Sequence, residues 1–334
     1  MTSQERSAGK ARGVGLVSGG LDSMLAVRLL QEQGVDVIGV TFVTPFFGPE
    51  QGLAAGRDLG ISTHVLDISL QHLQMLKSPV YGYGGQVNPC IDCHALMLKE
   101  AGRLMEKMGG DFLFTGEVLG QRPMSQRRDS LRSVEKLSGY PGKVLRPLSA
   151  RLLTPTLVEV EGLVDRARLL DIQGRSRKRQ EALALRYGIE QYPQPGGGCL
   201  LTKEGFARKL KALFHSFPEA NPRQAELIRF GRFFRFPGDS ICLVGRNRQD
   251  NEKLEAQASD EEGLFRVLDF PGPMGLLMGS HSLEKNFPFA AQLVLAYSDA
   301  PGDRSVRVEW RLGGETGVID LMKPMKEIFE SFHV

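Results

Sequence analysis

A glycine-rich stretch near the N-terminus has the residue types and the position of a phosphate-binding loop. The apolar run Val14-Gly15-Leu16-Val17 is typical of a buried parallel strand. Ser18-Gly19-Gly20 interrupts this run, and leucines at helical spacing follow from Leu21 until Gly34 ends the pattern. Glycines let a backbone approach an anion closely, and a helix N-terminus offers free N–H groups. The stretch predicts a phosphate cradle, with an ordinary strand–turn–helix connection as the alternative.

Three cysteines form a second candidate site. Cys90-Ile91-Asp92-Cys93 follows Pro89 and begins a helical pattern, where thiolates are favoured and low thiol pKa values are expected. Cys199 follows three glycines in a proline-bounded loop suited to a bulky inorganic group, with a flexible linker as the alternative. The set predicts a redox pair or metal site rather than disulfides, with inert buried thiols as the alternative. His94 is expected to cap or pack, and Cys242 to lie in a core without chemistry.

Alternating strands and helices must position these residues. Strands are expected at 35–42 and about 64–66, with a helix at about 50–59 between them, and a further strand and glycine turn at 111–116. This alternation indicates an α/β fold with a doubly wound parallel sheet. Ligands in such sheets lie beyond the carboxyl ends of the strands. We therefore expect a nucleotide site that includes residues from two further strand ends: Thr41, Phe42, Gly116, Glu117 and Gln121.

Length and composition suggest two domains. The chain has 334 residues, 41% of them hydrophobic and 24% charged, which is typical of a soluble globular protein. No apolar run is long enough for a membrane span, and the polar start lacks a signal-peptide core, so a cytoplasmic location is expected. We expect a nucleotide domain at 1–170, a connecting segment at 171–219 with the third cysteine, and a smaller α+β domain at 220–334. In that domain, strands are expected at 240–245, 264–270, 293–297 and 306–312.

Basic residues cluster locally, although the net charge is only +3. A strip beside the expected nucleotide site is suited to a phosphate backbone; its members include Arg122, Arg127, Arg128 and Arg132. A solvated helix face is the alternative for this strip. The basic run at 175–179 is interpreted as a solvated helix.

The motifs together resemble a known family. Ser18-Gly19-Gly20-Leu21-Asp22-Ser23 resembles the PP-loop signature of ATP pyrophosphatases, which cleave ATP to AMP and pyrophosphate. With the segments 88–93 and 115–126, the chain is similar over roughly residues 10–200 to the catalytic domain of tRNA 4-thiouridine synthetases, and more distantly to tRNA 2-thiouridine synthases. The resemblance implies a PP-loop/HUP-like sheet, ATP and Mg²⁺. It implies that the loop 18–23, Leu21 included, binds ATP: Ser18, Gly19, Gly20 and Ser23 would hold pyrophosphate, and Asp22 would serve the metal or the loop geometry. Gly116 and Glu117 would lie near the α-phosphate. Thr41, Phe42 and Gln121 are expected at the same site from their places at strand ends, with a plain strand end as the alternative for Thr41 and Phe42.

The resemblance also implies a reaction. The uracil carbonyl oxygen attacks the α-phosphate of ATP, pyrophosphate leaves, and sulfide then displaces AMP. A subset of these enzymes has a C-x-x-C pair and one distant cysteine that hold a [4Fe–4S] cluster with one open iron, and Cys90, Cys93 and Cys199 fit that arrangement. Zinc with His94 or water as fourth ligand is the competing interpretation. The sulfur would come from sulfide or from a donor such as a cysteine desulfurase.

The C-terminal part resembles an NFACT-type RNA-binding domain. The segments 244–254 and 269–273 carry this likeness, and Arg246 and Arg248 are the expected RNA-contacting residues. The expected partner is tRNA, and a homodimer is expected because related thiolases are often dimers. The resemblance therefore predicts ATP-dependent tRNA uridine thiolation, most simply to 4-thiouridine. The alternatives are a PP-loop ligase or amidotransferase-like enzyme with structural zinc, and a non-catalytic RNA-binding sensor of ATP or redox state.

Overall fold

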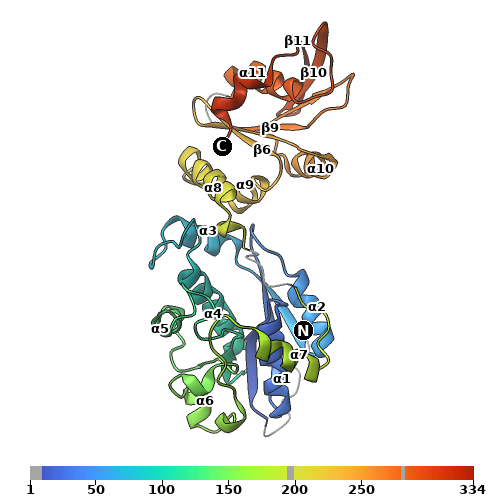
Figure 1. The fold of residues 1–334 in the computed structure, drawn as a ribbon. Coiled ribbons are helices and arrows are strands. Elements are labelled where there is room, and N and C mark those ends of the chain that lie inside the picture. Colours follow the sequence, from blue (N-terminus) through green and yellow to red (C-terminus); the bar gives the residue numbers. More distant parts are fainter. Residues whose placement is uncertain (1–9, 194–198, 280–282) are drawn as a thin grey trace. The chain divides into compact units, whose positions relative to one another are not determined.

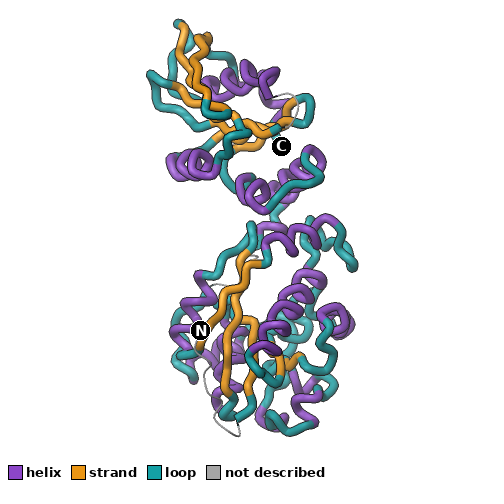
Figure 2. Tube along the Cα trace, turned by 180° about the vertical axis from the view of Figure 1, so that it is seen from behind, coloured by secondary structure: helices purple, strands orange, loops and turns teal. Residues whose placement is uncertain are grey.

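A five-stranded parallel sheet forms the centre of the N-terminal part of the chain (Figures 1 and 2). The computed structural model describes residues 10–193, 199–279 and 283–334. The strand order is β3-β2-β1-β4-β5, and every neighbouring pair is parallel. The strands are β1 (Arg12–Leu16), β2 (Asp36–Val43), β3 (Ser62–Asp67), β4 (Phe112–Phe114) and β5 (Val144–Leu145). The chain order reverses between β1 and β4, which makes their carboxyl ends the place where a ligand is expected.

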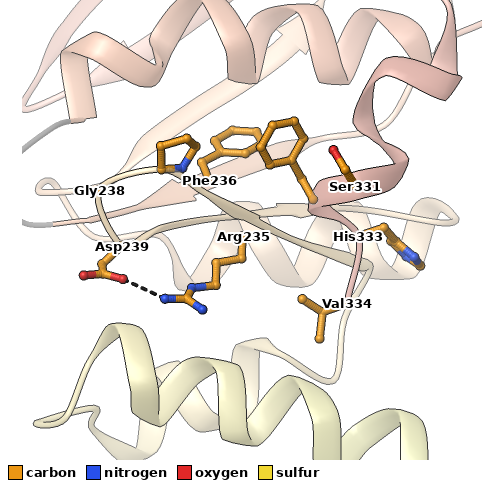
Figure 3. A pocket seen from close by; sticks show the side chains of 9 residues that line it. Arg235, Phe236, Gly238, Asp239, Ser331, His333 and Val334 are labelled. Atoms are coloured by element: carbon orange, nitrogen blue, oxygen red, sulfur yellow. Dashed lines mark hydrogen bonds and ion pairs between the residues drawn. The ribbon is translucent and has the colours of Figure 1, made fainter.

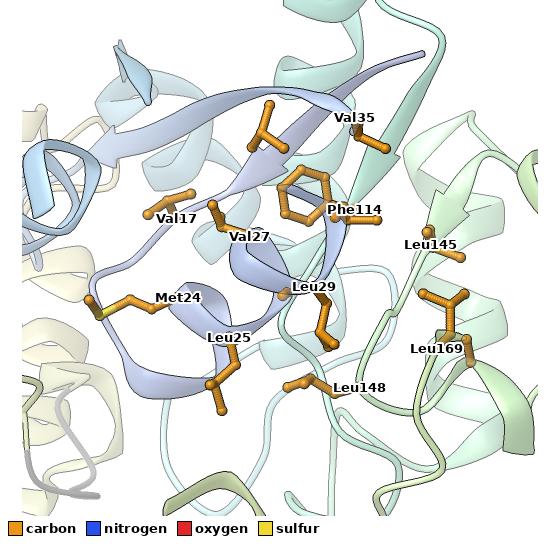
Figure 4. Close-up of a cluster of buried hydrophobic side chains, with 14 of the residues drawn as sticks. Val17, Met24, Leu25, Val27, Leu29, Val35, Phe114, Leu145, Leu148 and Leu169 are labelled. Carbon is orange, nitrogen blue, oxygen red and sulfur yellow. The ribbon is translucent and has the colours of Figure 1, made fainter. Parts of the chain in front are cut away.

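Helices cover both faces of this sheet, which confirms the doubly wound α/β prediction. They are α1 (Leu21–Glu32), α2 (Glu50–Leu59), α3 (Ser69–Lys77), α4 (Cys90–Lys107), α5 (Arg128–Ser138), α6 (Leu157–Val160) and α7 (Lys178–Arg186). Side chains alternate along a strand, so neighbouring residues enter different cores. In β2, Val37 packs in the core that contains α1, and Ile38 packs in the core that contains α4. Figure 4 shows the first of these cores, with Phe114 and Leu25 among its members.

The chain divides into two compact units at Cys199 and Leu200. The segment before this division belongs to the first unit because α7 packs on α1: Ala184 and Ile189 are buried in the core of α1. The hydroxyl of Tyr187 also donates a hydrogen bond to Glu32, at 2.8 Å. Residues 171–190 therefore complete the core of the first unit, whereas the sequence suggests only a connecting segment there.

A six-stranded antiparallel sheet forms the second unit, in the order β11-β10-β8-β9-β7-β6. Its strands are β6 (Arg232–Phe236), β7 (Ser240–Val244), β8 (Gly263–Val267), β9 (Gly275–Met278), β10 (Ser305–Leu312) and β11 (Glu315–Met322). Its helices are α8 (Glu204–Ser216), α9 (Pro222–Leu227), α10 (Arg248–Gln257) and α11 (Leu283–Ala296). Cys242 of β7 is fully buried, as predicted. The smaller α+β C-terminal domain is thereby confirmed.

The prediction of a strand at 293–297 is wrong, because these residues lie in and just after α11. Leu293, Val294 and Leu295 are all fully buried against the sheet. The last turns of α11 are buried on nearly every side, and their sequence therefore resembles the apolar run of a buried strand. No helix within the described residues is long and apolar enough to cross a membrane.

The central strand residue Phe114 provides a test of the first core. Its side chain is 0% exposed, and its ring lies over Gly15, where an added Cβ would be 2.1 Å from the ring. We expect Phe114→Ala to lower the free energy of unfolding by about 3–5 kcal/mol, because the lost apolar contacts leave a cavity. The measurement is urea denaturation followed by circular dichroism. Val65→Ala is the control, since Val65 is 44% exposed on β3; an equal loss in both variants would contradict the placement of this core.

Candidate functional site

The glycine-rich loop leads directly from β1 into α1. Gly19 has φ of +81°, and a Cβ there would lie 2.5 Å from the carbonyl oxygen of Gln51, so only glycine fits. The helix begins after Gly20 without a side-chain cap. The hydroxyl of Ser23 donates to the carbonyl oxygen of Gly20, at 2.7 Å. The loop therefore presents an uncapped helix N-terminus, the arrangement that binds phosphate.

The loop after β4 meets the glycine-rich loop. The amide Nε2 of Gln121 donates to Oδ2 of Asp22, at 3.1 Å. A Cβ at Gly116 would lie 2.5 Å from the backbone carbon of Asp22, so the two backbones are packed together at this point. The structure thus brings Asp22 next to Gly116 and Gln121, which follow it in the chain by 94 and 99 positions. Their proximity follows from the adjacency of β1 and β4.

Asp22 has an unusual environment for a carboxylate. Burial raises its pKa, while the hydrogen bond from Gln121 and the charge of Arg177 act in the opposite direction. Its second oxygen, Oδ1, is buried and has no hydrogen-bond partner among the described residues. A buried carboxylate oxygen of this kind fits a bound cation, and oxygen atoms are the ligands that Mg²⁺ prefers.

The strand-end residues Thr41 and Phe42 are both buried. Thr41 Oγ1 lies against α2, where a Cβ at Gly52 would be only 2.4 Å away. The side chain of Phe42 packs in the core that contains α4. Ser18, by contrast, is exposed at the start of the loop. Because the side chains of Thr41 and Phe42 are packed inside the protein, a nucleotide at this edge would contact the backbone at the end of β2. At the end of β1 it would contact the side chain of Ser18.

Glu117 is turned into the protein and forms a buried charge network. Its Oε1 lies 2.7 Å from Nδ1 of His94, and its Oε2 lies 3.0 Å from Nε of Arg146. Burial by itself would raise its pKa, but Arg146 and His94 more than offset this and lower the pKa to about 2. Arg146 also pairs with Glu135. Glu117 thus joins the first turn of α4 to the loop after β4.

The cysteine pair lies at the first turn of α4, as predicted. Nδ2 of Asn88 lies 3.4 Å from Sγ of Cys90. The prediction of a low pKa is wrong for Cys93: burial raises the pKa of this thiol, and the charges of Cys199 and Cys90 raise it further. Desolvation in this case outweighs the favourable field of the helix N-terminus. The same interactions show that the third cysteine lies near the C-x-x-C pair.

His72 of α3 is a further neighbour of the pair that the sequence does not single out. Its Nε2 lies 3.3 Å from Sγ of Cys93. The ring is fully buried beside Phe46 and Phe47, at centroid distances of 5.5 and 5.8 Å. Burial lowers its pKa to about 4, so the ring is neutral at pH 7. In the sequence, His72 precedes Leu73 and occupies an apolar position of an amphipathic helix. This pattern predicts an ordinary core residue and gives no sign of a contact with a cysteine.

The cysteine site does not have the arrangement of a single-metal site. Among the residues that the structure describes, no three His, Cys, Asp or Glu side chains are arranged to hold one metal ion. His94, the expected fourth zinc ligand, instead bonds Glu117. In a [4Fe–4S] cluster each thiolate binds a different iron, so the sulfur atoms stand farther apart than around zinc. The three neighbouring thiols supply the donor type that a cluster requires; the glycines at 196–198 lie outside the described residues.

The expected RNA-contacting arginines differ in how free they are. Arg122, Arg127 and Arg132 are exposed, and Arg128 is exposed but donates to the carbonyl oxygen of Leu152, at 2.9 Å. In the second unit, Arg246 pairs with the buried Asp250 at 2.7 Å and donates to the carbonyl oxygen of Arg229. Arg248 pairs with Glu252 on the surface. Arg246 therefore has a structural role in holding α10.

A pocket of about 450 Å³ opens in the second unit (Figure 3). Arg235 of β6 and Asp239 form an ion pair of 3.0 Å at one side, and His333 lies at another. The hairpin between β6 and β7 turns at Asp239, which has φ of +59°. This pocket holds none of the residues that the sequence singles out.

Comparison with known proteins assigns a family model to each unit. Residues 8–151 match the model described as "Thiamine biosynthesis protein (ThiI)", and residues 231–332 match "NFACT protein RNA binding domain". The chain is 32% identical over 151 residues to a probable tRNA sulfurtransferase of Limosilactobacillus fermentum, covering 42% of this chain and 35% of that protein. It is 34% identical over 116 residues to the tRNA-specific 2-thiouridylase MnmA of Pelobacter propionicus, covering 30% and 31%.

The chain spans about a third of the length of these curated relatives. Among solved structures, it is similar to a predicted subunit of tRNA methyltransferase from Methanocaldococcus jannaschii. That likeness has a TM-score of 0.35 and 14% identity, and it covers 53% of this chain and 76% of the other. At this level it is a general likeness of fold and carries no argument about activity.

The charge network around Glu117 predicts a pH-dependent stability. The folded-state pKa of about 2 lies below the ordinary value of 4.5, so the carboxylate stabilises the fold at neutral pH and this contribution is lost as the pH falls from about 4.5 to 2. At pH 7, Glu117→Gln should lower the free energy of unfolding by about 3 kcal/mol, because it removes one of the two carboxylates that pair with the buried Arg146. Urea unfolding between pH 7 and 2 measures both effects.

Two results would contradict this prediction. One is a variant that is as stable as the wild type at pH 7. The other is a difference between the two proteins that does not shrink toward pH 2. Asp171→Asn is the control because Asp171 pairs with Arg179 on the surface, where solvent screens the charges, and little change is expected.

Proposed function

We propose that this chain, whose residues 8–151 carry a ThiI-family domain and whose residues 231–332 form an NFACT-type RNA-binding domain, catalyses ATP-dependent thiolation of uridine in tRNA. The observation that carries the proposal is the meeting of the glycine-rich loop with the loop after β4, joined by the bond between Gln121 and Asp22. A nucleotide held there has its phosphates at the N-terminus of α1. The cysteines of α4 belong to the same unit.

Activation of the uracil carbonyl is the first step of the proposed reaction. The carbonyl oxygen attacks the α-phosphorus of ATP, a phosphorus–oxygen bond forms, and pyrophosphate leaves. The chain contributes position and charge: the backbone N–H of Leu21 at the uncapped start of α1 would face the phosphates, and Asp22 would hold Mg²⁺ through its free oxygen. Mg²⁺ supplies charge neutralisation on the leaving pyrophosphate.

Sulfur insertion is the second step, and Cys90, Cys93 and Cys199 are proposed to serve it. Sulfide attacks the activated ring carbon, and AMP leaves with the former carbonyl oxygen. The three thiols would hold a [4Fe–4S] cluster, which supplies an open iron site for exogenous sulfide. His72 can donate its Nε2–H to the sulfur of Cys93, and such outer hydrogen bonds orient thiolate ligands. Free sulfide or a cysteine desulfurase is the proposed sulfur source.

The second unit is proposed to bind tRNA. Its match to an RNA-binding domain supports this assignment. The exposed Arg122, Arg127 and Arg132 of the first unit would add contacts to the phosphate backbone. The 4-position of uridine is our proposed target because the ThiI model matches the catalytic unit, while relatives named for 2-thiouridine match a shorter segment.

Asp22→Asn tests the nucleotide half of the proposal. We expect tRNA-dependent release of pyrophosphate to fall about 10²–10³-fold, because the variant lacks the charge that would hold the metal. The urea midpoint at pH 7 should stay unchanged or rise, since burial raises the pKa of Asp22 and its charge therefore costs stability. Asp58→Asn, at an exposed position of α2, is the control. Undiminished pyrophosphate release in Asp22→Asn would remove the loop from the mechanism.

Cys199→Ala tests the sulfur half. After anaerobic reconstitution with iron and sulfide, we expect this variant to lose the cluster as fully as Cys90→Ala, because each thiolate would hold one iron. Iron and acid-labile sulfide are quantified together with the absorption spectrum. Cys242→Ala is the control, since Cys242 is buried in the second unit and should leave the iron content unchanged. A wild-type chain that holds zinc and no iron would favour the ligase alternative.

A further inference from the structure

Polar atoms without partners gather where α7 begins. Gln180 is 0% exposed, and neither its amide oxygen nor its amide nitrogen has a hydrogen-bond partner among the described residues. Nε of Arg177 and Oδ1 of Asp22 are buried and lack partners as well. Burial of an amide without hydrogen bonds is unfavourable, so such a group in a native protein points to a missing ligand.

Backbone contacts place the start of α7 beside the two loops of the site. The N–H of Gly174 donates to the carbonyl oxygen of Leu119, at 2.8 Å, and Leu119 also pairs with Gln173 as an isolated parallel bridge. Two residues after Leu119, Gln121 bonds Asp22. The segment that leads into α7 is thereby tied to the loop that holds Asp22.

Helices α1 and α7 pack on each other. Tyr187, at the end of α7, bonds Glu32 at the end of α1. Arg177 and Gln180, at the start of α7, both act to lower the pKa of Asp22 at the start of α1. Arg177 acts by its charge, and the Gln180 side chain by a polar contact with the carboxylate that falls short of hydrogen-bond geometry. Neither α1 nor α7 has a side-chain cap, so two helix N-termini with open N–H groups lie next to each other.

The free atoms are of two kinds. Asp22 Oδ1 and Gln180 Oε1 are acceptors, whereas Arg177 Nε and Gln180 Nε2 are donors. A lone anion would suit the donors but would be repelled by Asp22. A lone cation would suit the acceptors but would be repelled by Arg177. A magnesium ion together with a phosphate satisfies both kinds, and Mg²⁺ is commonly bound by one or two carboxylates and the phosphates of a substrate.

We propose that Gln180 and Arg177 of α7 bind the magnesium–pyrophosphate part of ATP. Gln180 Oε1 would join Asp22 Oδ1 as a magnesium ligand, while Gln180 Nε2 and Arg177 Nε donate hydrogen bonds to phosphate oxygens. This inference rests on the proposed function and deepens it. It extends the site to a helix outside the residues 8–151 that match the family model. It also gives a role to part of the basic run at 175–179.

The exposed residue Arg179 offers a matched control within the same run. It already pairs with Asp171, at 2.6 Å, and both side chains are about half exposed. Arg177→Met and Arg179→Met therefore remove the same charge from the same helix start. Only the first substitution removes a donor that is buried beside Asp22.

The experiment measures binding of sodium pyrophosphate to the full chain by titration calorimetry, in magnesium chloride and again in EDTA. In magnesium we expect Gln180→Met and Arg177→Met to bind at least about tenfold more weakly than the wild type, and Arg179→Met to bind equally well. In EDTA the difference between Gln180→Met and the wild type should shrink, because a metal ligand matters only with the metal present. The urea midpoint of Gln180→Met should be unchanged or higher, since methionine removes an unpaired buried amide.

The outcomes distinguish a failure of the inference about Gln180 and Arg177 from a failure of the proposed function. If the wild type binds magnesium pyrophosphate and Gln180→Met binds it equally well, the inference is overturned and the proposed function stands. This is the result expected if a buried water molecule, and not the ligand, bonds the Gln180 amide. If the wild type binds neither magnesium pyrophosphate nor ATP, both fail. If Gln180→Met does not fold, Arg177→Met against Arg179→Met gives the same decision at a position that is only partly buried.

Discussion

The buried carboxylate of Glu117 holds three parts of the first unit together. It bonds Arg146 just after β5, His94 in the first turn of α4 and Thr115 at the end of β4. Removing one partner from such a network leaves an uncompensated charge in a medium that solvates it poorly. The loop that carries Gln121 toward Asp22 and the helix that carries the cysteines are therefore fixed by the same group.

The surroundings of Asp22 show the opposite arrangement, with polar atoms left unpaired. The raised pKa of Asp22 and the unpaired amide of Gln180 both cost stability in the free chain. A bound magnesium and phosphate would satisfy them, so the site is more favourable when occupied. Active sites commonly sacrifice stability for function in this manner. Glu117 thus has charged partners inside the protein, whereas Asp22 Oδ1 and the Gln180 amide lack hydrogen-bond partners among the described residues.

The cysteine site has an equally specific environment. Burial raises the pKa of Cys93, and His72 beside it is neutral at pH 7. A thiol in these surroundings is protonated in the free chain, and it becomes a thiolate when a metal replaces the proton. The neighbouring imidazole can donate its N–H to the sulfur without adding a charge.

Local sequence determined the elements of this protein. The run before Ser18, the leucines of α1 and the glycine at position 34 set the strand, helix and helix end through nearest-neighbour periodicity, which needs no tertiary contact. The pattern of strands and helices was sufficient for the doubly wound sheet. It failed at α11, because the last turns of this helix are buried on nearly every side and have the same apolar run as a strand.

Tertiary structure decided the chemical state of the site. The sequence places Cys93 at a helix start, but its raised pKa results from burial, which depends on residues far along the chain. In the sequence, Gln180 is a polar residue next to a basic run and has no feature that marks it as part of a site. Only the packing of α7 on α1 brings it to Asp22. Periodicity acts over three or four residues, whereas desolvation and charge act through space. For this reason the sequence by itself determined the elements and motifs, and the fold alone decided their protonation and their partners.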